Sequence, residues 1–416
     1  MKANNSLFFK IAFVALIALL MLIPLSMVKN QIRERQGNAD ACQDEVSQSW
    51  GRAQTLAGPA LVFTYEQSVK DADGKSVTKS CEQTVYPKTL LYEIGTQTQK
   101  LHRSIYDVMV YHADVVATGT FVLPASLASL PLKEECVKLG ISDLRGIEGN
   151  ALIRLGEQNF HFSEGASGDH DPYIREGIRL EPGLMDGVTE IPFRLQLRTR
   201  GSRSILIKPY GDLTEVRMSS DCPDPSFTGD FLPTERKVDG QGFTAKWVVS
   251  QINRGKPDDT TFGVRLLENM TQYRQTERSV KYGILIILLI FVCGLGVELM
   301  TAKEINLVQY GVIGLSLVLF YALVLSFSEF LSFPLAYALA ASMTTLALLG
   351  YFRGILKSKE AWLLGGLVAV AYAVSYVLLQ METYAFLAGT LILFAVLAGI
   401  MYLTRNMNRP KGTVSE

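Results

Sequence analysis

The stretch SWGRAQTLAGPALVFTYE, residues 49–66, changes from a helix-like pattern to a strand-like pattern within a few residues. An apolar segment and a charged stretch precede it, and a long polar region follows it. The Gly58-Pro59 pair predicts the end of the helix, and ALVFTY begins a strand rich in β-branched and aromatic residues. The stretch therefore predicts a joint between a membrane anchor and a folded domain, rather than an active-site loop.

The composition of the chain indicates a membrane protein with a large soluble portion. Its 416 residues include 40 Lys and Arg and 40 Asp and Glu, so no bulk charge favours nucleic acid or an acidic substrate. Apolar residues make up 48% of the chain but are unevenly spread, since residues 281–404 hold few charges and residues 28–280 hold most of them. The lipid bilayer is the first partner that the sequence predicts.

Six apolar segments approach the length of about 20 residues that a helix needs to cross a bilayer. The first is residues 11–27, extended by Phe8 and Phe9, for which the alternative is a cleaved signal peptide. No small-x-small cleavage site closes this run, so we expect an uncleaved anchor. The other five are residues 282–300, 306–327, 331–352, 361–380 and 385–404.

The charges of the short loops predict the orientation of these spans. Lys303, the segment 353–359 and the tail after residue 404 carry Lys or Arg, whereas the two intervening loops carry none. By the positive-inside rule both termini are cytoplasmic and residues 28–280 lie on the opposite side of the membrane. Glu298 is expected at the cytoplasmic end of the second span, where its carboxylate can reach the headgroups.

The polar region between the first two spans predicts a stalk followed by a β-rich domain. Ile32, Ala39 and Val46 recur every seven residues, as on one apolar face of a helix. Asp73-Gly74 predicts a hairpin turn, and many short strand-like runs separated by Gly, Pro and Asp predict a sandwich or pair of sheets. The predicted organisation is an N-terminus and anchor over 1–27, a stalk helix and joint over 28–58, an exported β-rich domain over 59–280, a five-span bundle over 281–404 and a cytoplasmic tail over 405–416.

The cysteines agree with export of the β-rich domain. Cys42, Cys81, Cys136 and Cys222 all lie in the region predicted to be outside, where an oxidising compartment favours two disulfides. We expect Cys42 to pair with Cys81 and Cys136 with Cys222, because sequence neighbours close shorter loops; four reduced thiols are the alternative. Cys293 lies within a span and should be a lone apolar thiol.

The sequence predicts no catalytic, cofactor-binding or metal-binding residue. HFSEGASGDHDP, residues 161–172, gathers two His with acidic residues, but their spacing is not that of a known ligand set, and a solvated loop is expected. His112 alternates with apolar neighbours and should be a strand residue that faces outward. HExxH, GxSxG and P-loop motifs are absent, so enzymatic activity is left open but unsupported.

Several long motifs resemble the CreD family of bacterial inner-membrane proteins. They are SWGRAQTLAGPALVFTYE, RSIYDVMVYHADVVATGTFVLP, DCPDPSFTGDFLPTERKV and the membrane region after VQYGVIGLS, and the resemblance covers about residues 31–405. The resemblance implies an inner-membrane protein with a periplasmic domain, linked to cell-envelope integrity and stress response, including tolerance to colicins and β-lactams. Family members more often have Trp and His where this chain has Cys222 and Asp224, which favours a lineage-specific disulfide.

Three functions follow as alternatives. The first is envelope maintenance through a partner or ligand, such as a periplasmic or inner-membrane envelope protein, bound by the periplasmic domain. The second is a transporter of lipids or apolar substrates, which an apolar groove among the spans would favour. The third is a membrane-embedded enzyme acting on envelope precursors, which a cluster of polar side chains at the periplasmic face would favour. The family resemblance supplies no catalytic residues to decide among them.

Two acidic residues in the short outer loops are candidate contacts between the domain and the bundle. Glu329 and Glu382 have no neighbouring cation in sequence. The simpler interpretation is that both carboxylates lie in headgroup water. The alternative hypothesis is that they bind cationic side chains of the exported domain and thereby tie it to the bundle.

Overall fold

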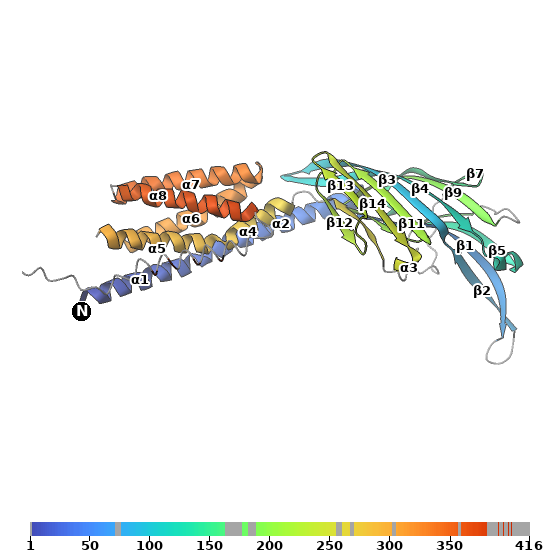
Figure 1. Ribbon diagram of the computed structural model, residues 1–416, viewed down its shortest axis with the longest axis horizontal. Helices are drawn as coiled ribbons and strands as arrows, with labels where there is room; N and C mark the ends of the chain where they lie inside the picture. The colour runs from blue at the N-terminus through green and yellow to red at the C-terminus, as the bar shows by residue number, and fades with distance from the viewer. Residues whose placement is uncertain are drawn as a thin grey trace, which may run out of the picture. The chain divides into compact units, whose positions relative to one another are not determined.

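The chain forms two compact units (Figure 1). One unit joins Met1–Asn38 to Asn269–Glu416, and the other is Ala39–Glu268. The first is helical, and the second is built mainly of strands. The computed structural model describes residues 2–70, 76–162, 177–181, 189–254, 260–266, 270–301, 305–356 and 359–380, with four single residues beyond position 389.

The helical unit contains the apolar helices that the sequence predicts as spans. α1 (Lys2–Leu20) and the start of α2 (Leu22–Trp50) form the N-terminal apolar helix, and a short amphipathic helix, α4 (Met270–Lys281), precedes four more apolar helices. These are α5 (Gly283–Thr301), α6 (Leu307–Ser328), α7 (Phe333–Leu356) and α8 (Lys359–Gln380). Each is close to the bilayer length. The predicted span 385–404 lies largely outside the described residues.

The N-terminal helix is interrupted once, at Met21, and Pro24 gives the reason. A proline inside a helix lacks the N–H that would bond to the carbonyl four residues earlier, which here belongs to Leu20. α1 therefore ends at Leu20 and α2 begins at Leu22. The N–H of Met21 still donates to Ile17 at 3.0 Å and the N–H of Leu25 to Met21 at 3.2 Å, so the chain keeps its direction.

Two glycines bring this helix close to its neighbours in the helical unit. A Cβ on Gly283 of α5 would lie 2.9 Å from Cδ1 of Leu25, and a Cβ on Gly314 of α6 would lie 2.9 Å from Met21. Small residues allow such close approach in membrane helices, where dispersion contacts replace the hydrophobic effect. The Leu25–Gly283 contact also fixes the level of α2 relative to the start of α5.

The β domain consists of two sheets, as the sequence predicts. Among the described residues, the first sheet has the order β12-β15-β10-β1-β5-β8, with β2 paired to β1 beside this path, and the second has the order β13-β14-β11-β3-β4-β9-β6-β7. The first sheet contains β1 (Gln54–Lys70), β2 (Ser76–Val85), β5 (Leu132–Ile141), β8 (Gly177–Leu180), β10 (Ser204–Lys208), β12 (Pro225–Gly229) and β15 (Phe262–Leu266). The second contains β3 (Pro87–Arg103), β4 (Tyr106–Val122), β6 (Ile147–Leu155), β7 (Gln158–His161), β9 (Glu190–Ser202), β11 (Leu213–Ser220), β13 (Glu235–Asp239) and β14 (Gly242–Ser250).

One shared core joins the two sheets. Phe63 and Phe262 of the first sheet and Tyr92 and Trp247 of the second are all at most 2% exposed. β9 shows the cause, because its residues alternate between buried and exposed from Glu190 to Thr199, as a strand with one buried face requires. The short elements η1 (Ala125–Ser129), η2 (Leu144–Gly146) and α3 (Gln251–Arg254) connect strands.

The joint differs from the sequence prediction in where the helix ends. α2 ends at Trp50 and β1 begins at Gln54, so the Gly58-Pro59 pair lies inside the strand. Gly51 gives the reason: its φ of +152° suits glycine, and a Cβ there would lie 2.8 Å from the Arg200 carbonyl oxygen. Gly58-Pro59, a cis peptide, falls in a bulge between Ala57 and Ala60, beyond which β1 exchanges β10 for β2 as its neighbour.

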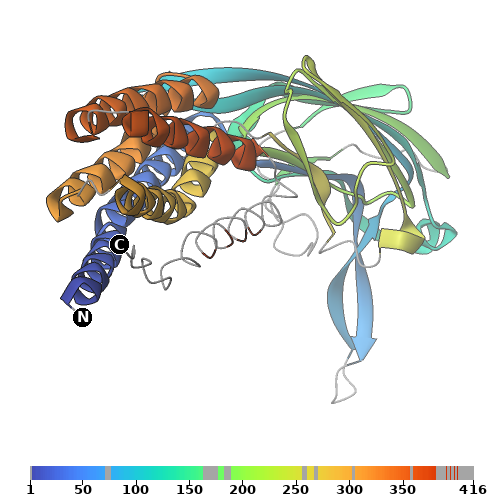
Figure 2. The ribbon, with the colours of Figure 1, turned by 60° about the vertical axis from the view of Figure 1, so that its left-hand side comes forward.

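The hairpin prediction is confirmed. β1 and β2 pair antiparallel from Leu61–Val85 to Lys70–Ser76, and this two-stranded ribbon extends away from the rest of the domain (Figure 2). The predicted turn at Asp73-Gly74 lies outside the described residues.

Candidate functional site

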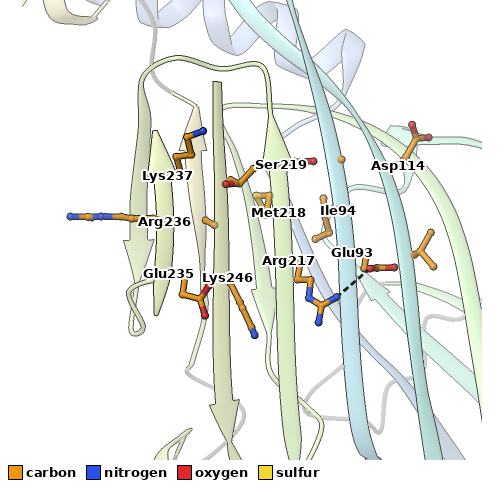
Figure 3. Close-up of a pocket in the computed structure, with 14 residues that line it drawn as sticks. Glu93, Ile94, Asp114, Arg217, Met218, Ser219, Glu235, Arg236, Lys237 and Lys246 are labelled. Atoms are coloured by element: carbon orange, nitrogen blue, oxygen red, sulfur yellow. Dashed lines mark ion pairs between the residues drawn. The ribbon is translucent and has the colours of Figure 1, made fainter. Parts of the chain in front are cut away.

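An open groove crosses the outer face of the second sheet (Figure 3). Its volume is about 660 Å³, and five strands, β3, β4, β11, β13 and β14, supply its walls. The side chains of one row come from paired positions, because Lys246 lies opposite both Arg217 and Glu235, and Arg217 lies opposite Glu93. The remaining charged lining residues are Asp114, Arg236 and Lys237. The groove is therefore a charged surface with both signs interspersed.

Arg217 and Lys246 in this groove pair with acidic side chains in the groove and beside it. Arg217 contacts Glu93 at 3.7 Å and Glu215 at 2.8 Å, and Lys246 contacts Glu215 at 3.4 Å. Burial raises the pKa of Glu215, but the hydrogen bonds and charges of Arg217 and Lys246 outweigh this and hold its pKa below the usual range. A set of ionised, mutually paired groups suits recognition of a polar ligand, since each pair can exchange its partner for a ligand group.

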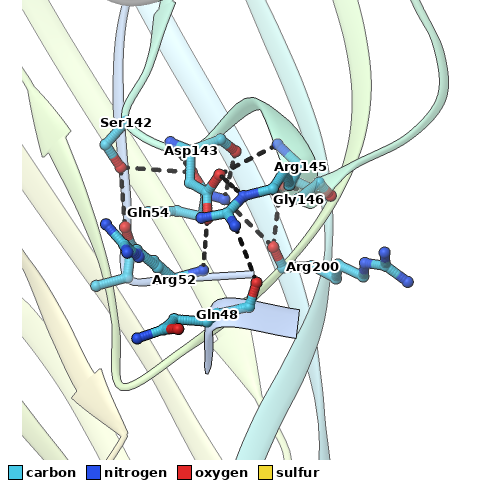
Figure 4. Close-up of polar contacts among 10 residues, drawn as sticks. Gln48, Arg52, Gln54, Ser142, Asp143, Arg145, Gly146 and Arg200 are labelled. Atoms are coloured by element: carbon cyan, nitrogen blue, oxygen red, sulfur yellow. Dashed lines mark hydrogen bonds and ion pairs between the residues drawn. The ribbon is translucent and has the colours of Figure 1, made fainter. Parts of the chain in front are cut away.

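A second polar cluster lies at the joint between α2 and β1 (Figure 4). Asp143 accepts hydrogen bonds from the Arg52 backbone N–H at 2.9 Å and from the Arg145 Nε at 3.1 Å. Arg145 also donates to the Gln48 carbonyl at 3.0 Å, and the Gln54 side chain donates to the Asp143 carbonyl at 2.9 Å. These bonds connect the last turn of α2, the first residues of β1 and η2.

The chemistry of this cluster is structural. Burial raises the pKa of Asp143, yet the Arg52 N–H and the Arg145 guanidinium together hold its pKa below the usual value. Gly146 closes the cluster, because a Cβ there would lie 2.2 Å from Gln54 Nε2 and 2.4 Å from the Arg200 carbonyl oxygen. The polar groups of this cluster all bond to backbone groups or to an oppositely charged side chain within the domain. The opening stretch therefore forms a joint, as the sequence predicts.

The end of α2 also packs on the outer face of the second sheet. Trp50 contacts the His112 ring edge-on at a centroid distance of 5.2 Å, and the Arg200 guanidinium lies 5.2 Å from the Trp50 ring. His112 contacts Glu148 at 2.9 Å through Nδ1. His112 thus lies on the outward face of β4, as expected, but Trp50 and Glu148 half-bury it.

Comparison with known proteins identifies the family. The family described as inner membrane protein CreD matches residues 6–409. The chain belongs to the CreD family. It is 28% identical over 437 aligned residues to inner membrane protein CreD of Escherichia coli strain K12, covering 97% of this chain and 94% of that protein.

Two solved structures show only distant similarity to this CreD-family chain. An M1 zinc metallopeptidase from Deinococcus radiodurans gives a TM-score of 0.22 at 10% identity, covering 44% of this chain and 42% of the other. A nutrient-binding protein from Legionella pneumophila gives 0.29 at 9% identity, covering 55% of this chain and 85% of the other. Neither similarity carries an argument about function.

The two predicted disulfides are not seen in this CreD-family chain. No disulfide joins the cysteines in the part of the chain that the structure describes. Cys42 packs with Val46 and Val108 on the second sheet, whereas Cys81 belongs to β2 of the first sheet and contacts Gln67. Cys222 lies in the shared core, and Cys136 is a buried residue of β5. Both pairings remain predictions, and the first would have to join residues that contact different sheets.

Glu329 has a cationic partner in the structure. Its Oε1 lies 3.3 Å from Nε of Arg35 on α2, and the Glu329 side chain is 11% exposed. Both residues of this pair belong to the helical unit. The observed partner of Glu329 is therefore on the stalk helix, and the hypothesis that Glu329 binds a cation of the β domain stays a prediction. Glu382 lies outside the described residues, as do Glu164, Asp169, His170 and Asp171.

Sequence reasoning missed the environment of Glu298. Its side chain, 10% exposed, forms an ion pair with Lys10 of α1 instead of reaching out to the headgroups, and Tyr310 of α6 donates a hydrogen bond to its Oε2 at 3.4 Å. Lys10 and Glu298 are 288 residues apart. The sequence did contain a signal for this pair, because Lys10 and Glu298 both lie at the predicted cytoplasmic end of an apolar segment.

Proposed function

We propose that this protein supports cell-envelope integrity and the envelope-stress response, including colicin and β-lactam tolerance, by binding an envelope ligand or partner through its β domain. The observation that carries the proposal is the charged groove across β3, β4, β11, β13 and β14. In this proposal residues 28–280 lie in the periplasm and both termini in the cytoplasm, as the loop charges predict. The helices then hold the domain at the membrane surface.

Two features of the groove support recognition rather than catalysis. First, its lining residues include no His or Cys, so the usual general base and the usual thiol nucleophile are absent from these described positions. Second, Arg217 and Glu93 form an ion pair that is largely exposed, with 54% of the Arg217 side chain and 53% of the Glu93 side chain accessible. Exposed complementary charges contribute mainly to specificity and association rate.

A photo-crosslinking experiment tests the proposal. The photo-reactive residue replaces Thr244, which is exposed in the groove, or Thr78, which is exposed on β2 and serves as the matched control. We expect a specific crosslinked species in cells at position 244 only, which disappears in the Glu93→Lys/Arg217→Glu variant. Loss of colicin tolerance in that variant, at unchanged protein level, would link the groove to the function. Equal labelling at both positions with unchanged tolerance would contradict the proposal.

The orientation is tested separately. Reporter fusions after residue 150 should be active in the periplasm, and fusions after Lys357 should be active in the cytoplasm. A fusion after Lys357 that is active in the periplasm would contradict the predicted arrangement of spans.

A transporter of lipids or apolar substrates is the second candidate, and one observation favours it. A groove of about 640 Å³ lies between α7 and α8, lined by Ala, Ser and Thr residues and by the rings of Tyr337, Tyr372 and Tyr376. Its size and apolar walls are typical of small-molecule pockets. Replacing Ala341 and Ala373 by Leu should then abolish uptake of a fluorescent phospholipid by the reconstituted protein. Unchanged uptake, or none by the native protein, would contradict this candidate.

A further inference from the structure

Cationic residues gather in α2 just after the apolar part of the N-terminal helix, and in α4 just before α5. Residues 29–35 of α2 contain three cations and one acid, and residues 274–281 of α4 again contain three cations and one acid. Both segments belong to the helical unit. Figure 1 shows α4 and α5 running beside the N-terminal helix. By sequence, both cationic segments carry an excess of positive charge.

The packing places two of these cations at one level of the unit. Leu25 of α2 contacts Gly283 of α5. Lys29 lies four residues after Leu25, about 6 Å along the helix, and Lys281 lies two residues before Gly283. Next to them in sequence, Val28 and Tyr282 still pack against the apolar core of the unit. Both lysines therefore lie at the edge of the apolar segment, where a long side chain can bring its ammonium group to the level of the lipid headgroups.

The cations farther along α2 have protein partners. Arg33 contacts Glu277 of α4 at 3.6 Å, and Arg35 contacts Glu329 at 3.3 Å. Across the described residues, neither Lys29 nor Lys281 has a carboxylate within ion-pair distance. Lys281 is exposed and Lys29 is half-buried. Two lysines at the apolar edge thus lack the compensation that the neighbouring arginines have.

We propose that Lys29 and Lys281 bind the headgroup phosphate of anionic phospholipids at this end of the bundle. A phosphate supplies the acceptor oxygens and the negative charge that two ammonium groups require. The side of the membrane follows from the sequence: Lys281 precedes α5, and the loop that follows α5 in sequence contains Lys303 and is the one that the loop charges assign to the cytoplasm. The anionic lipid would therefore be held in the leaflet that faces the β domain's predicted compartment. This inference does not depend on the groove of the β domain.

Lipid retention by the full chain tests the site. The protein is extracted from nanodiscs that contain equal amounts of phosphatidylglycerol and phosphatidylcholine, and the retained lipids are counted by native mass spectrometry. We expect phosphatidylglycerol to be enriched, and we expect Lys29→Gln/Lys281→Gln to lower its affinity about 30-fold, or about fivefold for each lysine. Lys29→Arg/Lys281→Arg should keep most of the enrichment, since the charge is retained.

Lys359→Gln, at the start of α8, is the matched control and should leave the enrichment unchanged. Equal enrichment in the native protein and the double Gln variant would overturn the proposal. Displacement of phosphatidylglycerol by millimolar inorganic phosphate would show a site for free phosphate instead of a lipid, and would also overturn it. If the double Gln variant does not fold, a sodium chloride titration of the native protein replaces it: enrichment must fall as salt rises, and enrichment that does not change with salt would overturn the proposal.

Discussion

Charged side chains have different surroundings in the helical unit and in the β domain. In the helical unit Lys10 and Glu298 form a single pair whose side chains are 22% and 10% exposed. On the outer face of the second sheet, Arg217, Lys246, Glu93 and Glu215 share partners, and Arg217 and Glu93 are more than half exposed. The comparison teaches that a partly buried ion pair depends on both members, whereas an exposed network of shared partners tolerates the loss of one.

Glu298→Ala should have the largest effect on stability. The variant leaves the Lys10 ammonium without its partner at the edge of an apolar segment, so we expect the free energy of unfolding to fall by about 2–3 kcal/mol. The midpoint of unfolding in an SDS titration of the purified protein measures the change. Lys10→Met/Glu298→Leu removes both charges and should recover most of the loss. If Glu298→Ala is as stable as the native protein, the Lys10–Glu298 pair does not depend on both members, and the two regions do not differ in this respect.

Asp143→Asn should have an intermediate effect, because Asp143 is 8% exposed and its partners are charged or backbone donors. We expect a loss of about 1–3 kcal/mol, measured through tryptophan fluorescence during urea unfolding. Since the pKa of Asp143 is lowered in the folded state, its contribution is fully present above the unfolded value of about 3.9 and is lost as the pH falls through the folded value.

The difference between Asp143→Asn and the native protein should therefore be constant from about pH 7 to pH 5 and should shrink below about pH 4. A difference that persists unchanged at low pH would show that the ionised carboxylate is not the stabilising species.

Glu329→Gln should have a smaller effect confined to the attachment of α2. Loss of the contact to Arg35, which is 37% exposed, should loosen α2 from the turn between α6 and α7 by at most about 1 kcal/mol. Trypsin should then cut near Arg278 up to about fivefold faster, with the spans still inserted. The control is Glu34→Gln, which changes an exposed residue of α2 next to Arg35. Clipping at the native rate would show that the Arg35–Glu329 contact does not hold α2 in place.

Arg217→Ala should have the smallest effect on stability. Glu215 keeps Lys246 as a partner at 3.4 Å, so we expect less than about 1 kcal/mol in the same urea unfolding measurement. The same variant should still impair ligand capture at Thr244, because the groove loses a recognition group. A large loss of stability would show that the outer face is structural and would weaken the proposed function.

The sequence alone determined the class of each unit. Four apolar segments after the β domain match α5 to α8 because the thickness of a bilayer fixes the length of a span. Alternating apolar residues, as in β9, predicted strands because side chains along a strand point to opposite faces. The joint was also predicted, although its helix ends at Trp50, just before Gly51, and not at Gly58, since the close approach of the Arg200 carbonyl to Gly51 cannot be inferred from local sequence.

Only the tertiary structure decided which distant residues meet. The Lys10–Glu298 pair and the Arg35–Glu329 pair each join two segments between which the whole β domain lies in the sequence. The charged groove needs five strands in a specific register, and β3 pairs parallel with β11, more than a hundred residues later in the chain. Periodicity specifies which face of an element is buried, but it does not specify the neighbour that buries it. That choice depends on the packing of the whole chain, and the candidate site depends on it as well.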